Sequence, residues 1–197
     1  MATLIDLVGS VFIGAFVILL GIDLNQSVAG SVDAAAASVN VQESLVEIVQ
    51  WLEHDLRKIG YGVTDPKNAI VISSPGLIRF KADMNRDGVT DNVDWYIANP
   101  HRAASGDTVY NLYRKMNSNT PELAGVDITT FSLRYLKEDG APADTTTKSQ
   151  IWIVETTLKV QSPYEVADDV KGNDELGTVK GFWRQTRLAS RNIKRHG

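Results

Sequence analysis

Two hydrophobic patterns follow one another in the first sixty residues of the chain. Residues 7–22 carry no charge between Asp6 and Asp23, and residues 24–32 are again uncharged. Further along, hydrophobic residues recur every three or four positions, which is the spacing of one face of an α-helix. They are Val41, Leu45, Ile48, Val49, Leu52, Leu56 and Ile59. Because no proline interrupts residues 1–60, the pattern predicts one long helix, apolar in its first half and amphipathic in its second.

The periodicity changes from helical to extended beyond residue 60. Gly60 and Gly62 favour the end of the helix, because glycine readily adopts the left-handed conformation of a helix C-cap. Seven later segments have strand character and are separated by loops rich in glycine, proline, asparagine and aspartate. The predicted strands are residues 69–73, 77–82, 93–98, 109–115, 128–136, 151–160 and 178–188. Residues 139–150 and 162–177 are polar and turn-rich, which predicts exposed loops.

Together these elements predict an α+β protein. An antiparallel sheet buries one face, and the amphipathic half of the helix offers the apolar stripe that can cover it. We therefore expect an antiparallel β-sheet domain packed on the C-terminal half of the long helix. The chain then divides into a protruding hydrophobic half-helix, residues 1–32, and a globular domain, residues 33–197. The globular domain comprises helix 33–60 and the β-sheet domain 61–197.

The composition of the chain excludes disulfides and disfavours several classes of function. The chain of 197 residues contains no cysteine, so no disulfide can stabilise it. Its net charge of -4 disfavours general nucleic-acid binding. The histidines, His54, His101 and His196, lack the spacing of a metal or catalytic site. No nucleophile elbow, phosphate-binding glycine loop or dinucleotide fingerprint occurs, so we do not expect an enzyme.

The uncharged run near the N-terminus has more than one interpretation. Its sixteen residues between Asp6 and Asp23 are fewer than the roughly 20 apolar residues that cross a bilayer core, so a membrane span is possible but not ideal. A secretory signal peptide is disfavoured, because no lysine or arginine precedes Arg57 and the run is not succeeded by a small-residue cleavage site. The carboxylate of Asp6 should have a cationic partner, because an unpaired charge in an apolar environment is costly.

The opening MATLIDLVGSVFIGAFVILL resembles the N-terminal helix of type IV pilins and type II secretion pseudopilins. The pattern is carried by Thr3, Leu4, Ile5 and Asp6 after Met1. In that family the acid neutralises the N-terminal amine of a neighbouring subunit, and the helices bundle into a filament core. The resemblance thus implies a pilin-like fold, homo-oligomerisation into a helical filament, insertion in the inner membrane before assembly, and a pilus or secretion assembly machinery as partner.

Two narrower segments resemble one branch of this family. WLEHDLRKIGYGV at residues 51–63 and TRLASRNI at residues 186–193 are similar to PilW-like minor pilins and J-type pseudopilins. The chain departs from the family in carrying Asp6 instead of glutamate, one position late if Met1 is the processed N-terminus. The basic leader ending in glycine is absent, so we interpret the sequence as a mature form.

The segment DMNRDGVTDNVD at residues 83–94 has the ligand spacing of a calcium loop. Oxygen donors stand at loop positions 1, 3, 5, 9 and 12, with glycine at position 6 and a backbone carbonyl at position 7. The expected ligands are Asp83, Asn85, Asp87, Val89 through its carbonyl, Asp91 and Asp94. The alternative is an Asx-rich hairpin turn without an ion. Four aspartates in one loop would repel one another without a cation, which favours calcium as a cofactor.

Two further features allow a plain and a functional interpretation. The four tryptophans, Trp51, Trp95, Trp152 and Trp183, are expected in the core rather than in a ligand platform. The basic tail at residues 183–196 is expected to be a solvated strand and terminus rather than a binding site for anions.

The residues and the resemblance together predict a structural subunit of a type IV pilus-like extracellular filament, stiffened by calcium. The resemblance also implies that the helix around Gly14 and Gly21 loses helicity on assembly. One alternative is a minor pilin or pseudopilin at a filament tip or in a periplasmic type II secretion system. The alternative from another class is a monomeric, membrane-anchored, calcium-dependent binding module.

Overall fold

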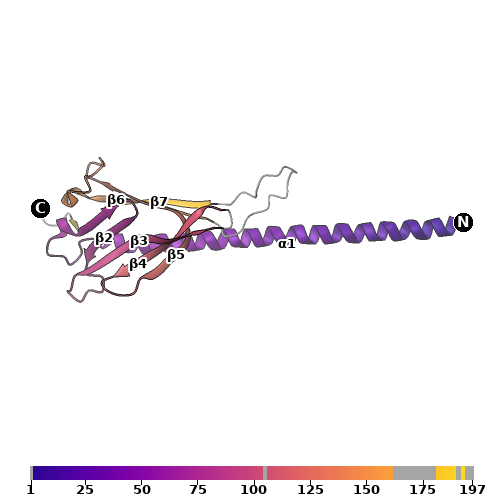
Figure 1. Cartoon of the computed structure of the whole chain (residues 1–197), viewed down its shortest axis with the longest axis horizontal. Helices are drawn as coiled ribbons and strands as arrows, with labels where there is room; N and C mark the ends of the chain where they lie inside the picture. Colours follow the sequence, from indigo (N-terminus) through magenta and orange to yellow (C-terminus); the bar gives the residue numbers. More distant parts are fainter. Residues whose placement is uncertain (1, 104–105, 162–180, 190–191, 194–197) are drawn as a thin grey trace.

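The computed structural model describes residues 2–103, 106–161, 181–189 and 192–193. A single helix, α1 (Ala2–Arg57), is 56 residues long and projects far beyond a domain gathered at its C-terminal end (Figure 1). The helix ends close to the predicted boundary. Gly60 has φ 79, and its N–H donates to the carbonyl oxygen of Lys81 at 3.0 Å, so the left-handed glycine turns the chain directly into the sheet.

Seven strands form one antiparallel sheet in which each strand pairs with the next along the chain. The strands are β1 (Ile70–Ser74), β2 (Leu77–Ala82), β3 (Asp91–Arg102), β4 (Thr108–Met116), β5 (Glu122–Leu136), β6 (Ile153–Gln161) and β7 (Gly181–Ala189). Two short 3-10 helices, η1 (Pro66–Asn68) and η2 (Lys148–Gln150), lie between strands or before the first. The predicted α+β class and all seven strands are confirmed.

The strand boundaries differ from the prediction where strand pairing continues through residues that do not alternate between apolar and polar. Strand β5 begins at Glu122, because residues 122–125 pair with β4 ahead of the predicted start. Strand β3 continues past a register shift between Ala98 and His101, where Asn99 has φ 54. Such bulges interrupt the alternation by which a strand is recognised. The predicted loop at residues 162–177 and the predicted start of the last strand, residues 178–180, lie outside the described residues.

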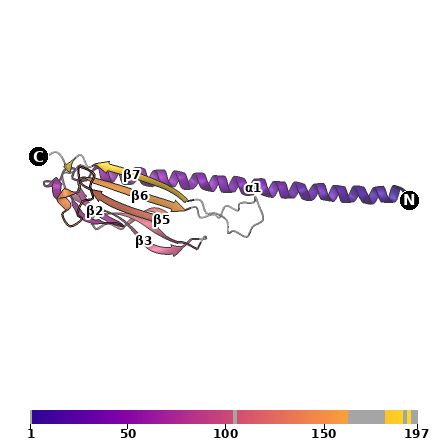
Figure 2. The ribbon, with the colours of Figure 1, turned by 90° about the horizontal axis from the view of Figure 1, so that it is seen from above.

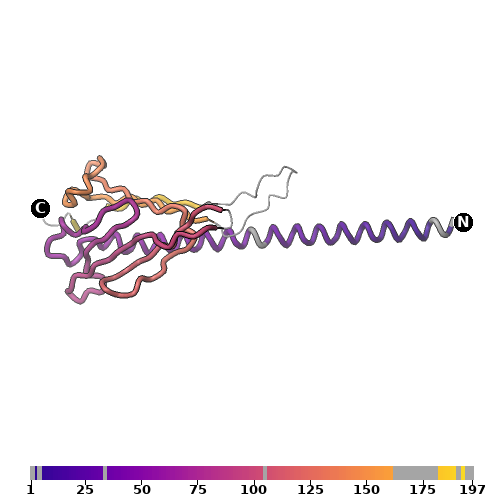
Figure 3. Tube along the Cα trace, in the orientation of Figure 1, coloured from indigo at the N-terminus to yellow at the C-terminus, as the bar shows by residue number. Residues whose placement is uncertain are grey.

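The sheet curls so that the hairpin of β1 and β2 contacts β5. The N–H of Leu133 in β5 donates to the carbonyl oxygen of Pro75 at 2.8 Å, and the Tyr135 hydroxyl donates to the carbonyl oxygen of Ser74 at 2.9 Å. Helix α1 lies along β7, with β6 and β5 beside it (Figure 2). Figure 3 shows the strands gathered at one end of α1. All seven residues of the predicted helical stripe are buried in one core with side chains of the sheet, including Phe80, Trp95 and Leu112.

The first half of α1 has no contact with this core. The first buried side chain along the described part of the helix is that of Ala37, whereas every large hydrophobic side chain described between Leu7 and Val32 is exposed. By length and composition, α1 is the one helix in the described chain that could cross a membrane. The most apolar stretch of this helix is fully exposed. The helix thus has one half built into the domain and one half without a partner.

Candidate metal loop and exposed helix surface

The loop between β2 and β3 folds around the carboxylate of Asp83. Oδ1 of Asp83 accepts the backbone N–H groups of Arg86 at 2.6 Å and Asp87 at 3.2 Å, and Oδ2 accepts the N–H of Gly88 at 3.0 Å. Arg86 and Gly88 have φ 64 and φ 84, so two left-handed residues make the turn. An Asx-type turn of this kind orders the loop without an ion, and it also orients the first residue of a calcium loop.

The next two predicted ligands lie on the same turn. The Asn85 amide donates to Oδ2 of Asp87 at 2.8 Å, and Oδ1 of Asp87 accepts the N–H of Val89 at 2.7 Å. The Val89 N–H and then the Asn85 amide hold the pKa of Asp87 below its ordinary value of 3.8. Both side chains are exposed. Asp87 is therefore a solvent-facing carboxylate at neutral pH, as a hard-cation ligand must be.

The last two predicted ligands have other partners. Asp91 is buried; its Oδ2 accepts the N–H of Met84 at 3.1 Å and its Oδ1 accepts the Asn117 amide at 2.7 Å. Asp94 forms a two-point ion pair with Arg79 on β2, with both N–O distances at 2.6 Å. Side chains alternate between the two faces of a strand. Asp91 and Asp94 are three positions apart, so they lie on different faces of β3. The structure brings Asp83, Asn85, Asp87 and Asp91 to the loop and leaves Asp94 outside it.

Five of the six predicted calcium ligands lie in this loop, and all five offer oxygen atoms. Asp83, Asn85, Asp87 and Asp91, with the Val89 carbonyl, are oxygen donors of the kind that calcium takes. Among the residues that the structure describes, no three acidic, histidine or cysteine side chains already converge as a metal site. A bound ion would require the Asn85, Asp87 and Val89 oxygens to turn inward.

The loop is also fastened to the end of α1. The N–H of Asp83 donates to the carbonyl oxygen of Tyr61 at 2.8 Å, and the Lys58 ammonium donates to the carbonyl oxygen of Met84 at 2.9 Å. A Cβ on Gly62 would stand 2.7 Å from the Cβ of Asp83, and Gly62 has φ 67, so only glycine fits there. Any ion that orders the loop therefore also stabilises the junction of helix and sheet.

The residues predicted for assembly lie on the half of α1 that has no partner. Thr3 and Asp6 are exposed, and Met1 lies outside the described residues. A Cβ added at Gly14 or Gly21 would have nothing within 4 Å. Within the described structure Asp6 and Asp23 form no ion pair. The predicted assembly residues thus share one solvent-facing half-helix that is apolar apart from two carboxylates and a few uncharged polar side chains.

Sequence reasoning missed a buried charge cluster beneath α1. Asp55 is 1% exposed, accepts the Trp95 indole N–H at 3.0 Å, and pairs with Nε of Arg114 at 2.6 Å. The Arg114 guanidinium also pairs with Glu122 at 3.1 Å and lies over the ring of Trp51, 5.3 Å from its centroid. An acid among the apolar positions of an amphipathic helix is the signal that could have revealed it, since Asp55 lies beside Leu52 and Leu56 on the buried stripe.

The expected core packing is shown for two of the four tryptophans, Trp51 and Trp95. Trp95 is fully buried and meets Trp51 edge-to-face at 5.5 Å between ring centroids, and Trp152 is half-buried. Trp183 is 65% exposed, so its predicted core position is wrong. It lies on β7 at the open edge of the sheet, and no further described strand covers it.

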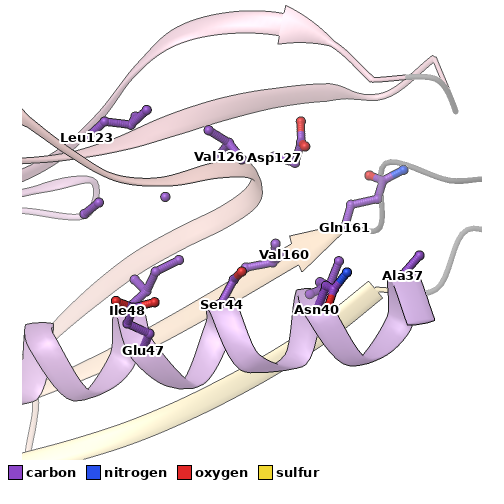
Figure 4. A pocket seen from close by; sticks show the side chains of 13 residues that line it. Ala37, Asn40, Ser44, Glu47, Ile48, Leu123, Val126, Asp127, Val160 and Gln161 are labelled. Atoms are coloured by element: carbon purple, nitrogen blue, oxygen red, sulfur yellow. The ribbon is translucent and has the colours of Figure 1, made fainter. Parts of the chain in front are cut away.

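A groove of about 420 Å³ opens between α1 and the first half of β5. Figure 4 shows Asn40, Ser44 and Glu47 of α1 facing Leu123 and Val126 of β5 across it. Its described lining has carboxylates in Glu47 and Asp127 but no basic side chain. Among the described residues of that lining, no nucleophile is in contact with a base.

A comparison of the sequence with protein-family models finds no match. A comparison with curated proteins finds none either. The geometry and the sequence pattern are therefore the basis for assigning a function.

Proposed function

We propose that the chain is a structural subunit of a type IV pilus-like extracellular filament, assembled through the hydrophobic half of α1. The observation that carries the proposal is the contrast between the two halves of one helix. The second half is built into a domain core, whereas the first half exposes fourteen large hydrophobic side chains between Leu7 and Val32. Such a surface greatly exceeds the apolar patches of soluble monomers, so it needs a lipid or protein environment.

Energetics favour burial of this half-helix in two successive environments. Each large apolar side chain gains about 1.5 to 3 kcal/mol on leaving water, so either a bilayer or a bundle of like helices stabilises it strongly. A bilayer provides no partner for the carboxylate of Asp6, whereas the N-terminal amine of a neighbouring copy does. The subunit would thus reside in the inner membrane before assembly and on the cell surface afterwards.

The loop at residues 83–94 fits the same function as a stabilising element. A filament subunit outside the cytoplasm meets calcium, and this chain has no cysteine for a disulfide. Calcium bound by Asp83, Asn85, Asp87 and Asp91 would fix the start of β3 against the end of α1. Asp94 would continue to pair with Arg79.

Electron microscopy of material sheared from the surface of cells that make this chain tests the proposal. We expect thin filaments that contain the chain as their main component, identified by mass spectrometry. A chain found at single copies on filaments built of another subunit would indicate the minor pilin or pseudopilin role, which the resemblance of residues 51–63 supports. A chain that stays monomeric in the membrane fraction would contradict the filament and leave the calcium-dependent binding module.

A further inference from the structure

A shallow groove follows the boundary between α1 and the open edge strand β7. Its volume is about 640 Å³, and we call it the β7 groove. It is lined by Gln42, Leu45, Val46, Phe182, Trp183, Arg184 and Gln185. Val46 and Trp183 are 40% and 65% exposed, so two large apolar side chains face solvent beside the last described strand of the sheet. Trp183 is thus exposed at the rim of a partly apolar groove that runs along the helix.

The β7 groove continues the bare surface of the half-helix. Val32, Val39 and Val46 are spaced seven residues apart on α1, and all three are exposed. Residues seven apart lie on nearly the same face of a helix, as in the seam where two helices pack. This valine stripe runs from the unpartnered half of α1 into the β7 groove. An apolar helix that packs along the first half of α1 can therefore extend into the groove without leaving an apolar surface.

The charged residues of α1 indicate which helix could occupy the β7 groove. Before His54 and Arg57, α1 carries carboxylates but no basic residue. Asp23 follows Leu19 and Leu20 by one turn and precedes Gln26 and Ser27 by one turn, and it is the one charged residue between Asp6 and Asp33. In a helix bundle such a carboxylate needs a cation, and the N-terminal amine of a neighbour can serve Asp6 but not Asp23 as well.

Arg184 is the one basic side chain that lines the β7 groove among the described residues. It forms no ion pair with any of them. Glu53 lies close by on α1, but it is held by Arg57 at 3.2 Å and by the Thr186 hydroxyl at 3.0 Å. The groove thus combines a partly apolar lining with one guanidinium, which complements the carboxylate of Asp23 once Asp6 is paired with an N-terminal amine.

We propose that the β7 groove of one copy receives the apolar half of α1 from a second copy, with Arg184 paired to Asp23. The inference rests on the proposed filament and specifies one of its interfaces. In this interface the valine stripe and Phe182, which is on the same face of β7 as Arg184, contact the apolar side of the incoming helix, with Trp183 at the rim of the groove. Arg184 supplies the charge that the first half of α1 lacks.

Cysteine cross-linking in cells that make the full-length chain tests this contact, because the chain has no native cysteine. The variant D23C/R184C is oxidised in intact sheared filaments and separated under non-reducing conditions. We expect a ladder of covalent multimers, since each copy offers the thiol at position 23 to one neighbour and the thiol at position 184 to another. The matched control is D23C/R187C, because Arg187 lies on the same strand but points to the opposite sheet face, opposite Glu155. We expect at least about tenfold less cross-linking in the control.

Charge exchange provides a second measurement that does not depend on disulfide geometry. R184D and D23R should each lower filament yield by about tenfold or more, because each places two like charges opposite each other in the interface. The double variant D23R/R184D should recover most of the yield. R187D should leave the yield unchanged. Circular dichroism of each purified chain verifies the fold, which these exposed positions should not disturb.

The outcomes separate this inference from the proposed function. Filaments that form without disulfides between positions 23 and 184, or with as many in the R187C control, overturn the pairing and leave the filament intact. Disulfides only between the position-23 thiols of two copies would place helix against helix and also contradict it. If the wild-type chain forms no filaments and only monomers are recovered after oxidation, both the pairing and the proposed function fail.

Discussion

At the scale of single residues, the most consequential contact is the buried pair of Asp55 and Arg114. Burying two charges is costly, and the cost is offset here by the Trp95 indole, the Glu122 carboxylate and the face of Trp51. The pair joins α1 to β4 across 59 positions of sequence. It therefore determines how the helix is rotated over the sheet as well as how firmly it is held.

We predict that Arg114→Met destabilises the domain strongly. It leaves the carboxylate of Asp55 buried without its cation, which typically costs about 3 to 5 kcal/mol of unfolding free energy. The double variant D55N/R114M should recover part of that loss, because it removes both charges. Chemical denaturation of the full-length chain in detergent measures the difference. The matched control is Arg57→Met, which breaks a pair with Glu53 that is 64% exposed on the arginine side and 21% on the glutamate side, and it should cost about 1 kcal/mol or less. Equal losses in both single variants would contradict the special role of the buried pair.

We predict that the pKa of His101 is higher than that of an ordinary histidine. The Asn99 carbonyl oxygen and then the Asp127 carboxylate raise the pKa of His101 above its usual 6.5. Because the folded-state pKa is raised, the contribution of protonated His101 to stability is complete below pH 6.5. It is lost as the pH rises through the folded-state pKa. Asp127→Asn should lower the pKa of His101, and an NMR titration of the ring checks it. An unchanged pKa in that variant would show that Asp127 has no influence.

At the scale of elements, the loop between β2 and β3 has a conformation that its own hydrogen bonds already support. The Asp83 carboxylate collects three backbone N–H groups, so the turn forms in the absence of a ligand. An ion would therefore add stability to a turn that is already partly organised. The anchoring of this loop to Tyr61 and Lys58 would carry that gain to the junction with α1.

We predict that calcium raises the melting temperature of the full-length chain. An ion that binds only the folded form stabilises it by about 2.7 kcal/mol at a hundredfold excess over its dissociation constant. Asp87→Ala should abolish the response to calcium. Asp94→Asn should retain the response but lower the melting temperature in chelator, because it weakens the pair with Arg79. Identical melting of the wild-type chain in calcium and in excess chelator would establish the Asx turn without an ion.

The unpartnered half of α1 should lose helicity between residues 14 and 24 on assembly. Gly14 and Gly21 each lower helix stability by about 1 kcal/mol relative to alanine, and a Cβ added at either would meet no atom within 4 Å outside the neighbouring helix backbone. The double variant G14A/G21A should keep the stretch helical in the filament. Cryo-electron microscopy of both filaments measures the change. A continuous, undistorted helix through this stretch in the wild-type filament would contradict the prediction.

At the scale of the whole molecule, the protein is a folded domain on a helix whose first half exposes large hydrophobic side chains. The domain closes its core around the second half of α1, so the helix is both the central element of the fold and, in the proposed function, the attachment to a larger assembly. This arrangement separates folding from assembly. Substitutions in the first half of α1 should affect assembly and leave the β domain unchanged.

Asp6→Ala tests that separation directly. Removing the carboxylate removes its proposed pairing with the N-terminal amine of a neighbour, so filaments should be lost while the domain melts as in the wild type. Electron microscopy of sheared material and a thermal melt of the purified chain provide the two readouts. The conservative variant Asp6→Glu, which retains the charge, should restore assembly. Abundant normal filaments from Asp6→Ala would contradict the role of this acid.

The helix, its buried stripe and the approximate positions of the strands along the chain could be predicted from the sequence because each depends on local periodicity. Apolar residues three and four apart define a helix face wherever the helix packs, and alternation defines a strand before its partner is known. Glycines at residues 60 and 88 likewise act through their own φ angles. The sequence by itself therefore determined the α+β class and the amphipathic half of α1.

Tertiary structure alone decided which charged and aromatic side chains meet. Asp94 pairs with Arg79 because the register of β2 and β3 sets those residues opposite each other, and no local pattern specifies that register. Asp55 finds Arg114 for the same reason, across α1 and β4. Trp183 is exposed because it lies on the face of β7 opposite to Phe182 and Leu188, which pack against the core. These contacts depend on how distant segments pack, whereas periodicity reports only on neighbours along the chain.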